Sequence, residues 1–248
     1  MSVVGVSVPD QPLFIGEPGQ ADVVVENGGA EAVDVDARLD VPAGWTSGTA
    51  TGTVPAFGRA TLHVPVTATG APTVATITAL ANDARGQAQA AVLSAPRGDQ
   101  VPVALDAGTA TSPVLSSYTR LSPSDVWDAA KGFGWVGTPP QSRDRGTLDS
   151  LRRDLVTNTA PGTLRISVPA GSHTGYLLVG DAGFLADPMT VSSGGQTLLD
   201  LASPQPTGVF RWLAFPLDGG TSGRDVDLDF AAHVSGQFWR FAGLVVPR

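Results

Sequence analysis

The sequence is poor in several residues that commonly carry chemistry. It has no Cys, one Lys (Lys131), and three Glu, all in the first hundred residues. Without Cys, the chain has no disulfide, no thiolate metal site and no Cys nucleophile. Its formal net charge of −8 argues against nucleic-acid binding, because phosphate contacts need a basic surface. No apolar run approaches the roughly 18 residues of a membrane span, so we expect no membrane partner.

The chain has enough apolar residues to fill real cores. Its 248 residues are 42% hydrophobic, which suits one large domain or two of ordinary size. Apolar and charged residues alternate over 33–41 and again over 225–230, the period-two pattern of a half-buried strand. Turn signals recur about every ten residues, as in antiparallel sandwiches. A weak helix-start pattern, S-P-S-D, predicts one helical turn over 124–130, and 150–155 is ambiguous.

A change of pattern divides the chain. Residues 95–100, A-P-R-G-D-Q, have turn composition, and a different arrangement of strands follows them. We therefore expect an all-β fold of two sandwiches in series, with domains over residues 1–95 and 99–248.

Both parts resemble known families. The motifs E-P-G-Q, V-V-V-E-N-G-G, V-P-A-G-W-T and V-P-A-F-G, within residues 5–94, resemble the NEW3 immunoglobulin-like domain beside catalytic modules of bacterial glycosidases. Over residues 103–246, the motifs L-D-A-G-T-A, K-G-F-G-W-V, S-R-D-R-G and L-R-R-D-L-V look like the galactose-binding-like jelly roll that precedes the hydrolase module in bacterial rhamnogalacturonan acetylesterases. Phe133 and Trp135 stand where Tyr and Phe are common in that family, and A-G-S-H at 170–173 replaces its usual turn. These departures leave the ligand preference open.

One stretch, residues 127–154, is the first candidate for a ligand site. It holds two of the five Trp residues and five of the fifteen Lys and Arg residues. Aromatic rings can stack on the flat C–H faces of sugars, and Arg forks suit carboxylates such as those of galacturonate. The alternatives are that the rings fill the core and that the Arg residues pair internally with Asp144. The candidate ligand-binding residues are Trp127, Phe133, Trp135, Arg143 and Arg145.

No cofactor is required by the sequence, but sandwiches of this kind resemble calcium-stabilised carbohydrate modules. Asp106 on an early strand and Asp229, or Asp227, on a late one could supply oxygen ligands to structural calcium. The alternative is that Asp residues alternating along a strand form a solvated face. The three His residues are far apart in sequence, which argues against zinc.

Catalytic motifs are missing. Gly180-Asp181-Ala182 has Ala where an esterase of this kind would carry its Ser nucleophile, and no G-x-S-x-G occurs. A glycosidase needs two carboxylates with separated pKa values, yet the second half has no Glu. We therefore assign no catalytic residue.

Together these patterns predict a non-catalytic accessory region of a secreted bacterial carbohydrate-active enzyme. Its second domain would bind a plant-type polysaccharide containing rhamnose or galacturonate, and its partners would be that saccharide and a catalytic module. Two alternatives remain: a structural brace without a ligand of its own, and an intact glycosidase or carbohydrate esterase. Met1-Ser2-Val3 leads straight into strand-like sequence, so no signal peptide is evident in these residues.

Overall fold

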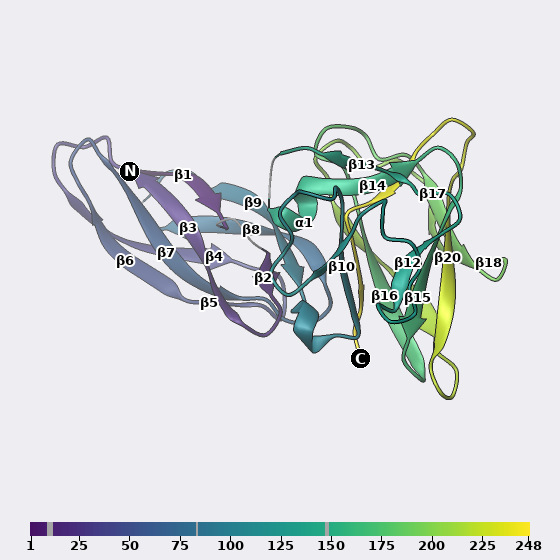
Figure 1. The fold of residues 1–248 in the computed structure, drawn as a ribbon. Coiled ribbons are helices and arrows are strands. Elements are labelled where there is room, and N and C mark those ends of the chain that lie inside the picture. The colour runs from purple at the N-terminus through teal and green to yellow at the C-terminus, as the bar shows by residue number, and fades with distance from the viewer. Residues whose placement is uncertain (9–11, 83, 147–148) are drawn as a thin grey trace. The chain divides into compact units, whose positions relative to one another are not determined.

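A computed structural model describes residues 1–8, 12–82, 84–146 and 149–248. Contacts between residues divide the chain into two compact units, Met1–Ala95 and Pro96–Arg248, which are considered separately. Strands make up nearly all of the regular structure in both units (Figure 1). The predicted all-β fold class is therefore confirmed.

The described residues of the first unit form nine strands in two sheets. They are β1 (Ser2–Ser7), β2 (Leu13–Phe14), β3 (Pro18–Glu26), β4 (Val33–Asp40), β5 (Thr46–Ser47), β6 (Thr49–Val54), β7 (Arg59–Thr67), β8 (Thr73–Ala81) and β9 (Ala88–Ala95). One sheet has the order β1-β3-β7-β5 and the other β2-β9-β8-β4-β6. Neighbouring strands run antiparallel except β2 and β9, which pair in parallel.

The sequence pattern explains why these two sheets face each other. On β4, Val35, Ala37 and Leu39 are buried while the residues between them are exposed, as the alternation predicts. They join one apolar cluster with residues of β3, β7 and β8, so both sheets contribute to a single core. At the turn after β3, the Asn27 side chain accepts a hydrogen bond from the Gly29 N–H (2.9 Å), which is how Asn stabilises such turns.

In the second unit, the part of the chain that the structure describes forms thirteen strands in three sheets and two short helices. The elements are η1 (Gly98–Gln100), β10 (Val103–Ala107), β11 (Thr119–Leu121), β12 (Phe133–Val136), β13 (Gln141–Asp144), α1 (Ser150–Arg153), β14 (Asp154–Asn158), β15 (Gly162–Val168), β16 (Ser172–Val179), β17 (Met189–Ser193), β18 (Gln196–Leu201), β19 (Arg211–Asp218), β20 (Arg224–Ala232), β21 (Trp239–Phe241) and β22 (Gly243–Val246). The sheet orders are β11-β10-β22-β16-β19, β12-β15-β20-β17-β18 and β13-β14-β21.

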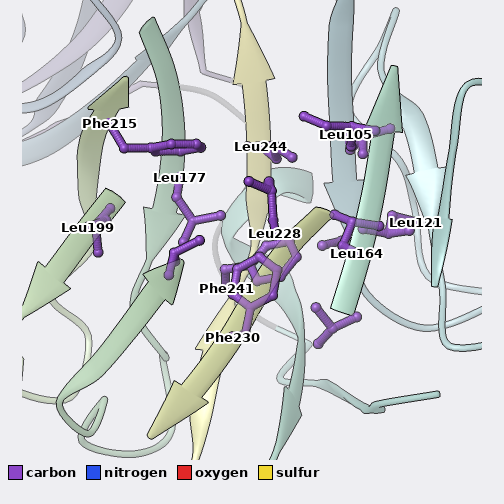
Figure 2. Packing of buried hydrophobic residues seen from close by; sticks show 14 of the residues in the cluster. Leu105, Leu121, Leu164, Leu177, Leu199, Phe215, Leu228, Phe230, Phe241 and Leu244 are labelled. Atoms are coloured by element: carbon purple, nitrogen blue, oxygen red, sulfur yellow. The ribbon is translucent and has the colours of Figure 1, made fainter. Parts of the chain in front are cut away.

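An aromatic cluster lies at the centre of this unit. Trp135, Phe230, Trp239 and Phe241 are each fully buried, and their ring centroids lie 4.9 to 6.4 Å apart. Leucines of β10, β16 and β22 meet leucines of β15 and β20 around it, so the two five-stranded sheets form a sandwich (Figure 2). Burying one such large apolar side chain stabilises the fold by about 1.5–3 kcal/mol.

The predicted helical turn over 124–130 is wrong. The Trp127 N–H donates to the Trp135 carbonyl oxygen (3.0 Å), and the Trp135 N–H donates to the Asp125 carbonyl oxygen (2.7 Å), so this backbone pairs with β12 and does not continue as a helix. Residues 126 and 128 then form isolated bridges to Trp135 and Phe133, so this segment lies alongside β12. The ambiguous stretch after Asp149 forms the single turn of α1, and Asp149 caps it by accepting from the Arg152 N–H (3.0 Å).

Candidate functional site

A pocket of about 380 Å³ opens in the second unit where β13, β14 and β21 meet two connecting segments. The first segment, 180–188, joins β16 to β17, and the second, 233–238, joins β20 to β21. We call this cavity the Phe184 pocket. Its lining residues are Arg143, Arg145, Thr157, Asp181, Phe184, Leu185, Asp187, Phe238 and Arg240.

Strand alternation brings two arginines to the pocket. Successive side chains of a strand point to opposite sides, so Arg143 and Arg145 share one side of β13 and its extension. Asp144, between them, points to the other side and binds Arg153 through two hydrogen bonds (2.9 and 3.0 Å). The pKa of Asp144 lies below its usual value, and these hydrogen bonds from Arg153 are the main cause.

Asp181 lies at the base of the pocket and is fully buried. Its Oδ1 accepts hydrogen bonds from Arg145 Nε (2.7 Å) and the N–H groups of Gly183 and Phe184, and its Oδ2 accepts from Arg145 Nη2 and Arg240 Nη1 (both 2.7 Å). Burial alone would raise the pKa of Asp181. The hydrogen bonds from Arg145 and Gly183 and the two guanidinium charges outweigh burial, so the pKa is lowered.

Arg240 extends this arrangement across the pocket. It is buried, and besides Asp181 it contacts Asp187 through Nη2 (3.4 Å). Its buried Nε has no hydrogen-bond partner among the described residues. Asp187 Oδ2 also accepts the Phe238 N–H (3.0 Å), while its Oδ1 has no partner in the described part of the chain. We call these four residues, Asp181, Arg145, Arg240 and Asp187, the Asp181 network.

Two phenylalanines give the pocket its apolar surface. The guanidinium of Arg145 lies 4.8 Å from the ring centroid of Phe184, and that of Arg240 lies 5.7 Å from the ring of Phe238. Phe184 is nevertheless 61% exposed, so the cation holds the ring while leaving much of its surface to solvent. An exposed ring beside a few fixed polar groups is the arrangement that small-ligand sites use.

Arg143 differs from the other two arginines of the pocket. It is exposed and donates to two neutral acceptors, the Ser142 carbonyl oxygen (2.8 Å) and Gln141 Oε1 (2.5 Å). Among the described residues it has no carboxylate partner. Its positive charge is therefore not neutralised by any carboxylate of the described residues.

The predicted aromatic site residues do not lie at this pocket. Trp135 is fully buried and Phe133 is 8% exposed, and both belong to the sandwich core, so neither can offer a ring face to a ligand. The indole Nε1–H of Trp135 is also occupied, because it donates to the Ser122 carbonyl oxygen (3.0 Å). Trp127 is half-buried on the outer side of β15, with the Arg165 guanidinium 5.5 Å from its ring. Of the five predicted residues, the pocket contains Arg143 and Arg145.

The predicted calcium ligands Asp106 and Asp229 are not brought together. On β10, Leu105 and Ala107 face the core, so Asp106 points to the outer side of its sheet. Asp229, between two core residues of β20, points to the outer side of the opposite sheet and accepts from Thr163 Oγ1 (2.7 Å). Two side chains on opposite outer faces cannot bind one ion. Within the described residues, no group of three or more His, Asp or Glu side chains is placed to hold a metal.

The Asp residues of β20 are instead paired with the strand beside them. Each one accepts a hydrogen bond from the residue opposite it on β15, and Asp227 accepts two from Arg165 (2.6 and 2.9 Å). The other two pairs are Thr163 with Asp229 and Ser167 with Asp225, each at 2.7 Å.

Asp106 belongs to a separate buried acidic group. Burial, followed by the nearby charge of Asp154, raises the pKa of Asp106 to about 8, although the Leu115 N–H donates to it (2.6 Å). Burial also raises the pKa of Asp154, which accepts hydrogen bonds from the Thr109 N–H (2.8 Å) and the Ser112 hydroxyl. These side chains do not line the Phe184 pocket.

Most of the pocket could not be found by sequence reasoning. Asp181 was considered only as part of a missing nucleophile motif, although it is the central acceptor of the site. Phe184 and Leu185 follow the G-D-A-G turn and belong to no strand pattern. Two adjacent apolar residues after a turn are the one sequence feature that could have indicated an exposed apolar surface here. Arg240 stands among the apolar and aromatic residues of 238–246, a composition that indicates a strand and marks no site. The lining residues missed are Thr157, Asp181, Phe184, Leu185, Asp187, Phe238 and Arg240.

The fold and this pocket define an all-β chain whose second unit carries a ligand-sized site. No protein-family model matches the sequence, and no curated protein matches it. No helix in the described ranges is both long enough and apolar enough to span a membrane.

Three solved structures show weak similarity to this chain. Protein YxiM from Bacillus subtilis is 17% identical with a TM-score of 0.46, over 59% of this chain and 39% of YxiM. Bacteroides uniformis beta-glucuronidase is 12% identical with a TM-score of 0.43, over 98% of this chain and 30% of the enzyme. The ANX2 ectodomain from Arabidopsis thaliana is 10% identical with a TM-score of 0.40, over 94% of this chain and 81% of the ectodomain. The chain thus spans well under half of the first two proteins, and likenesses this weak identify neither a family nor a ligand.

Proposed function

We propose that the chain is a non-catalytic accessory region of a secreted carbohydrate-active enzyme, and that its second unit binds a saccharide in the Phe184 pocket. The observation that carries this proposal is the pairing of an exposed ring with fixed polar groups in one cavity. Pyranose rings present apolar C–H faces and a rim of hydroxyls. Phe184 offers a surface for such a face, while Asp187 Oδ1 offers an acceptor for a hydroxyl.

The sequence motifs supply the choice of saccharide to test first. Their resemblance to domains of pectin-active enzymes favours plant-type polysaccharides that contain rhamnose or galacturonate. On this proposal the hydrolytic chemistry belongs to a separate catalytic module, so the chain alone should hydrolyse neither nitrophenyl acetate nor a nitrophenyl rhamnoside.

Calorimetric titration with rhamnogalacturonan and pectin fragments, with and without calcium, tests the proposal. We expect saturable heat with the unchanged chain and none with Phe184→Ala, while the unfolding temperature stays the same because the ring is mostly exposed. The matched control is Phe57→Ala, which removes another exposed Phe (75%) from the first unit. A flat trace from the unchanged chain across the whole panel would refute saccharide binding.

One observation favours a second candidate, a brace that packs on the catalytic module. Phe184 and Leu185 are adjacent and 61% and 46% exposed, and exposed apolar groups of this kind also occur in protein interfaces. On this alternative, the chain gives no heat with any saccharide, and Phe184→Ala weakens its association with the catalytic module in sedimentation experiments.

A further inference from the structure

The Phe184 pocket carries more positive than negative charge. Three Arg and two Asp line it, which leaves one formal positive charge in a chain whose formal net charge is −8. The pocket is therefore positively charged although the protein as a whole is acidic. A positively charged pocket attracts negatively charged ligands.

The excess charge can be assigned to one side chain. Arg145 binds Asp181 through two hydrogen bonds, and Arg240 contacts both Asp181 and Asp187, so these cations are compensated within the Asp181 network. The nearest acid in sequence to Arg143 is Asp144, which points to the other side of β13 and binds Arg153. Arg143 is left with the neutral acceptors Ser142 and Gln141.

We infer that the pocket selects acidic saccharides and that Arg143 forms the ion pair with the ligand's carboxylate. The inference rests on the proposed function, since it specifies which saccharides the same pocket takes. A guanidinium presents parallel N–H donors that match a carboxylate, and hydrogen bonds between charged groups are stronger than those to neutral acceptors. Exchanging the Gln141 and Ser142 acceptors for a carboxylate is therefore favourable, and Arg143 is exposed enough to make the exchange.

The other polar groups of the pocket determine which ligand groups can lie beside the carboxylate. Asp181 has its oxygens fully engaged by donors of the protein, so it is not available to a ligand. Asp187 Oδ1 is an acceptor near the same cavity and repels a second carboxylate while accepting a hydroxyl. A uronate sugar, with one carboxylate and several hydroxyls on an apolar ring, meets these requirements together.

The test compares ligands that differ only in the carboxylate. Calorimetry measures the Kd of the methyl glycoside of galacturonate, which carries one carboxylate, and of its methyl ester, and then of the corresponding glucuronate glycoside and its methyl ester. We expect each acid to bind about ten- to a hundredfold more tightly than its ester, the range that one charge-assisted hydrogen-bonded pair supplies. The preference should shrink as salt concentration rises, because the Arg143 charge is exposed.

Substitution of Arg143 then assigns the preference to this residue. Arg143→Gln should bind acid and ester equally, at about the affinity of the ester for the unchanged chain, whereas Arg143→Lys should retain part of the preference. The matched control is Arg211→Gln, which makes the same charge change at an exposed position outside the pocket and should leave the preference unaltered.

The outcomes separate this inference from the proposed function. If acid and ester bind equally to the unchanged chain, the pocket binds saccharides but the inference about charge is wrong. The inference also fails if Arg143→Gln keeps the preference, or if Arg211→Gln loses it to the same extent. If no acid, ester or neutral saccharide binds, the proposed function fails and the inference fails with it.

Discussion

Replacing Asp181 by Asn tests whether the Asp181 network holds the site together. Asn keeps one acceptor oxygen, which can still receive the N–H groups of Gly183 and Phe184. Its amide nitrogen, however, is a donor and faces Arg145 Nη2 and Arg240 Nη1, which are donors too. The substitution therefore removes the counter-charge and leaves two guanidinium groups without their main partner.

Burial sets the size of the expected effect. The Asp181 side chain is 0% exposed and that of Arg240 is 7% exposed, so neither can recover full hydration. Removing one partner of a buried ion pair costs about 3–5 kcal/mol. The matched control is Asp227→Asn: Asp227 accepts the same two hydrogen bonds from one Arg, but its side chain is 38% exposed. We expect that control to cost no more than about 1 kcal/mol.

Urea unfolding followed by Trp fluorescence measures the difference. Four of the five Trp residues lie in the second unit, so the signal reports mainly on the unit that carries the substitution. With a urea dependence of about 2 kcal/mol/M, Asp181→Asn should lower the midpoint by about 2 M and Asp227→Asn by less than about 0.5 M. If the urea midpoints of the two variants fell equally, burial would not be the reason that loss of Asp181 destabilises the fold.

The pH dependence of the same measurement has a defined sign. Because the folded-state pKa of Asp181 is lowered, its ionisation stabilises the fold above the unfolded pKa of about 3.9, and this contribution disappears as the pH falls through the folded value. The difference between the unchanged chain and Asp181→Asn should therefore be constant near neutral pH and narrow below about pH 4. A difference that widens in acid would contradict the lowered pKa.

Two further predictions concern buried residues outside the pocket. The folded-state pKa of Asp106 is raised to about 8, so the folded chain keeps a proton that the unfolded chain releases, and stability should fall by up to about 1.4 kcal/mol per pH unit between about pH 4 and 8. Asp106→Asn should flatten this slope in urea midpoints taken from pH 5 to 8, and an unchanged slope would show that Asp106 is not its source. Trp135→Ala should lower the unfolding free energy by about 3–5 kcal/mol, because it empties the centre of the aromatic cluster. If Trp135→Ala instead kept its thermal stability and lost saccharide binding, Trp135 would be a ligand-binding residue and not a core residue.

Of the elements of the fold, the strands were the easiest to predict from the sequence. Alternation at Leu164, Ile166 and Val168 directly encodes a strand with one buried face, and the structure places all three in the core. The helical turn over 124–130 did not form because the backbone of this segment pairs with β12, through hydrogen bonds between Trp127 and Trp135 and between Trp135 and Asp125. A local helix-start pattern does not contain this competing strand.

The candidate site was predictable only in part, for a related reason. The sequence proposed Arg143 and Arg145 as ligand contacts because Arg forks suit carboxylates, and both residues line the pocket, where their contact with a ligand stays a prediction. Phe133 and Trp135 lie in the core, because a ring that fills a core and a ring that meets a ligand have the same local sequence pattern, whereas half-buried Trp127 stays a prediction. Asp181 lies 36 residues from Arg145 and 59 from Arg240 in sequence, so their meeting depends on topology that local patterns do not contain.

The energetics of the Asp181 network argue that it serves the site more than the fold. Desolvating two guanidinium groups and a carboxylate offsets much of their attraction, so a well-packed apolar cluster would stabilise the sandwich at least as well. The network instead fixes positions: Asp181 holds Arg145, and Arg145 lies against the Phe184 ring while leaving much of it exposed. Arg145 and Arg240 are both paired with Asp residues of the network. On our inference, the charge of Arg143 therefore determines which ligands the pocket prefers. Asp181 and Asp187 thus compensate two of the three arginines, and Arg143 keeps no carboxylate partner among the described residues.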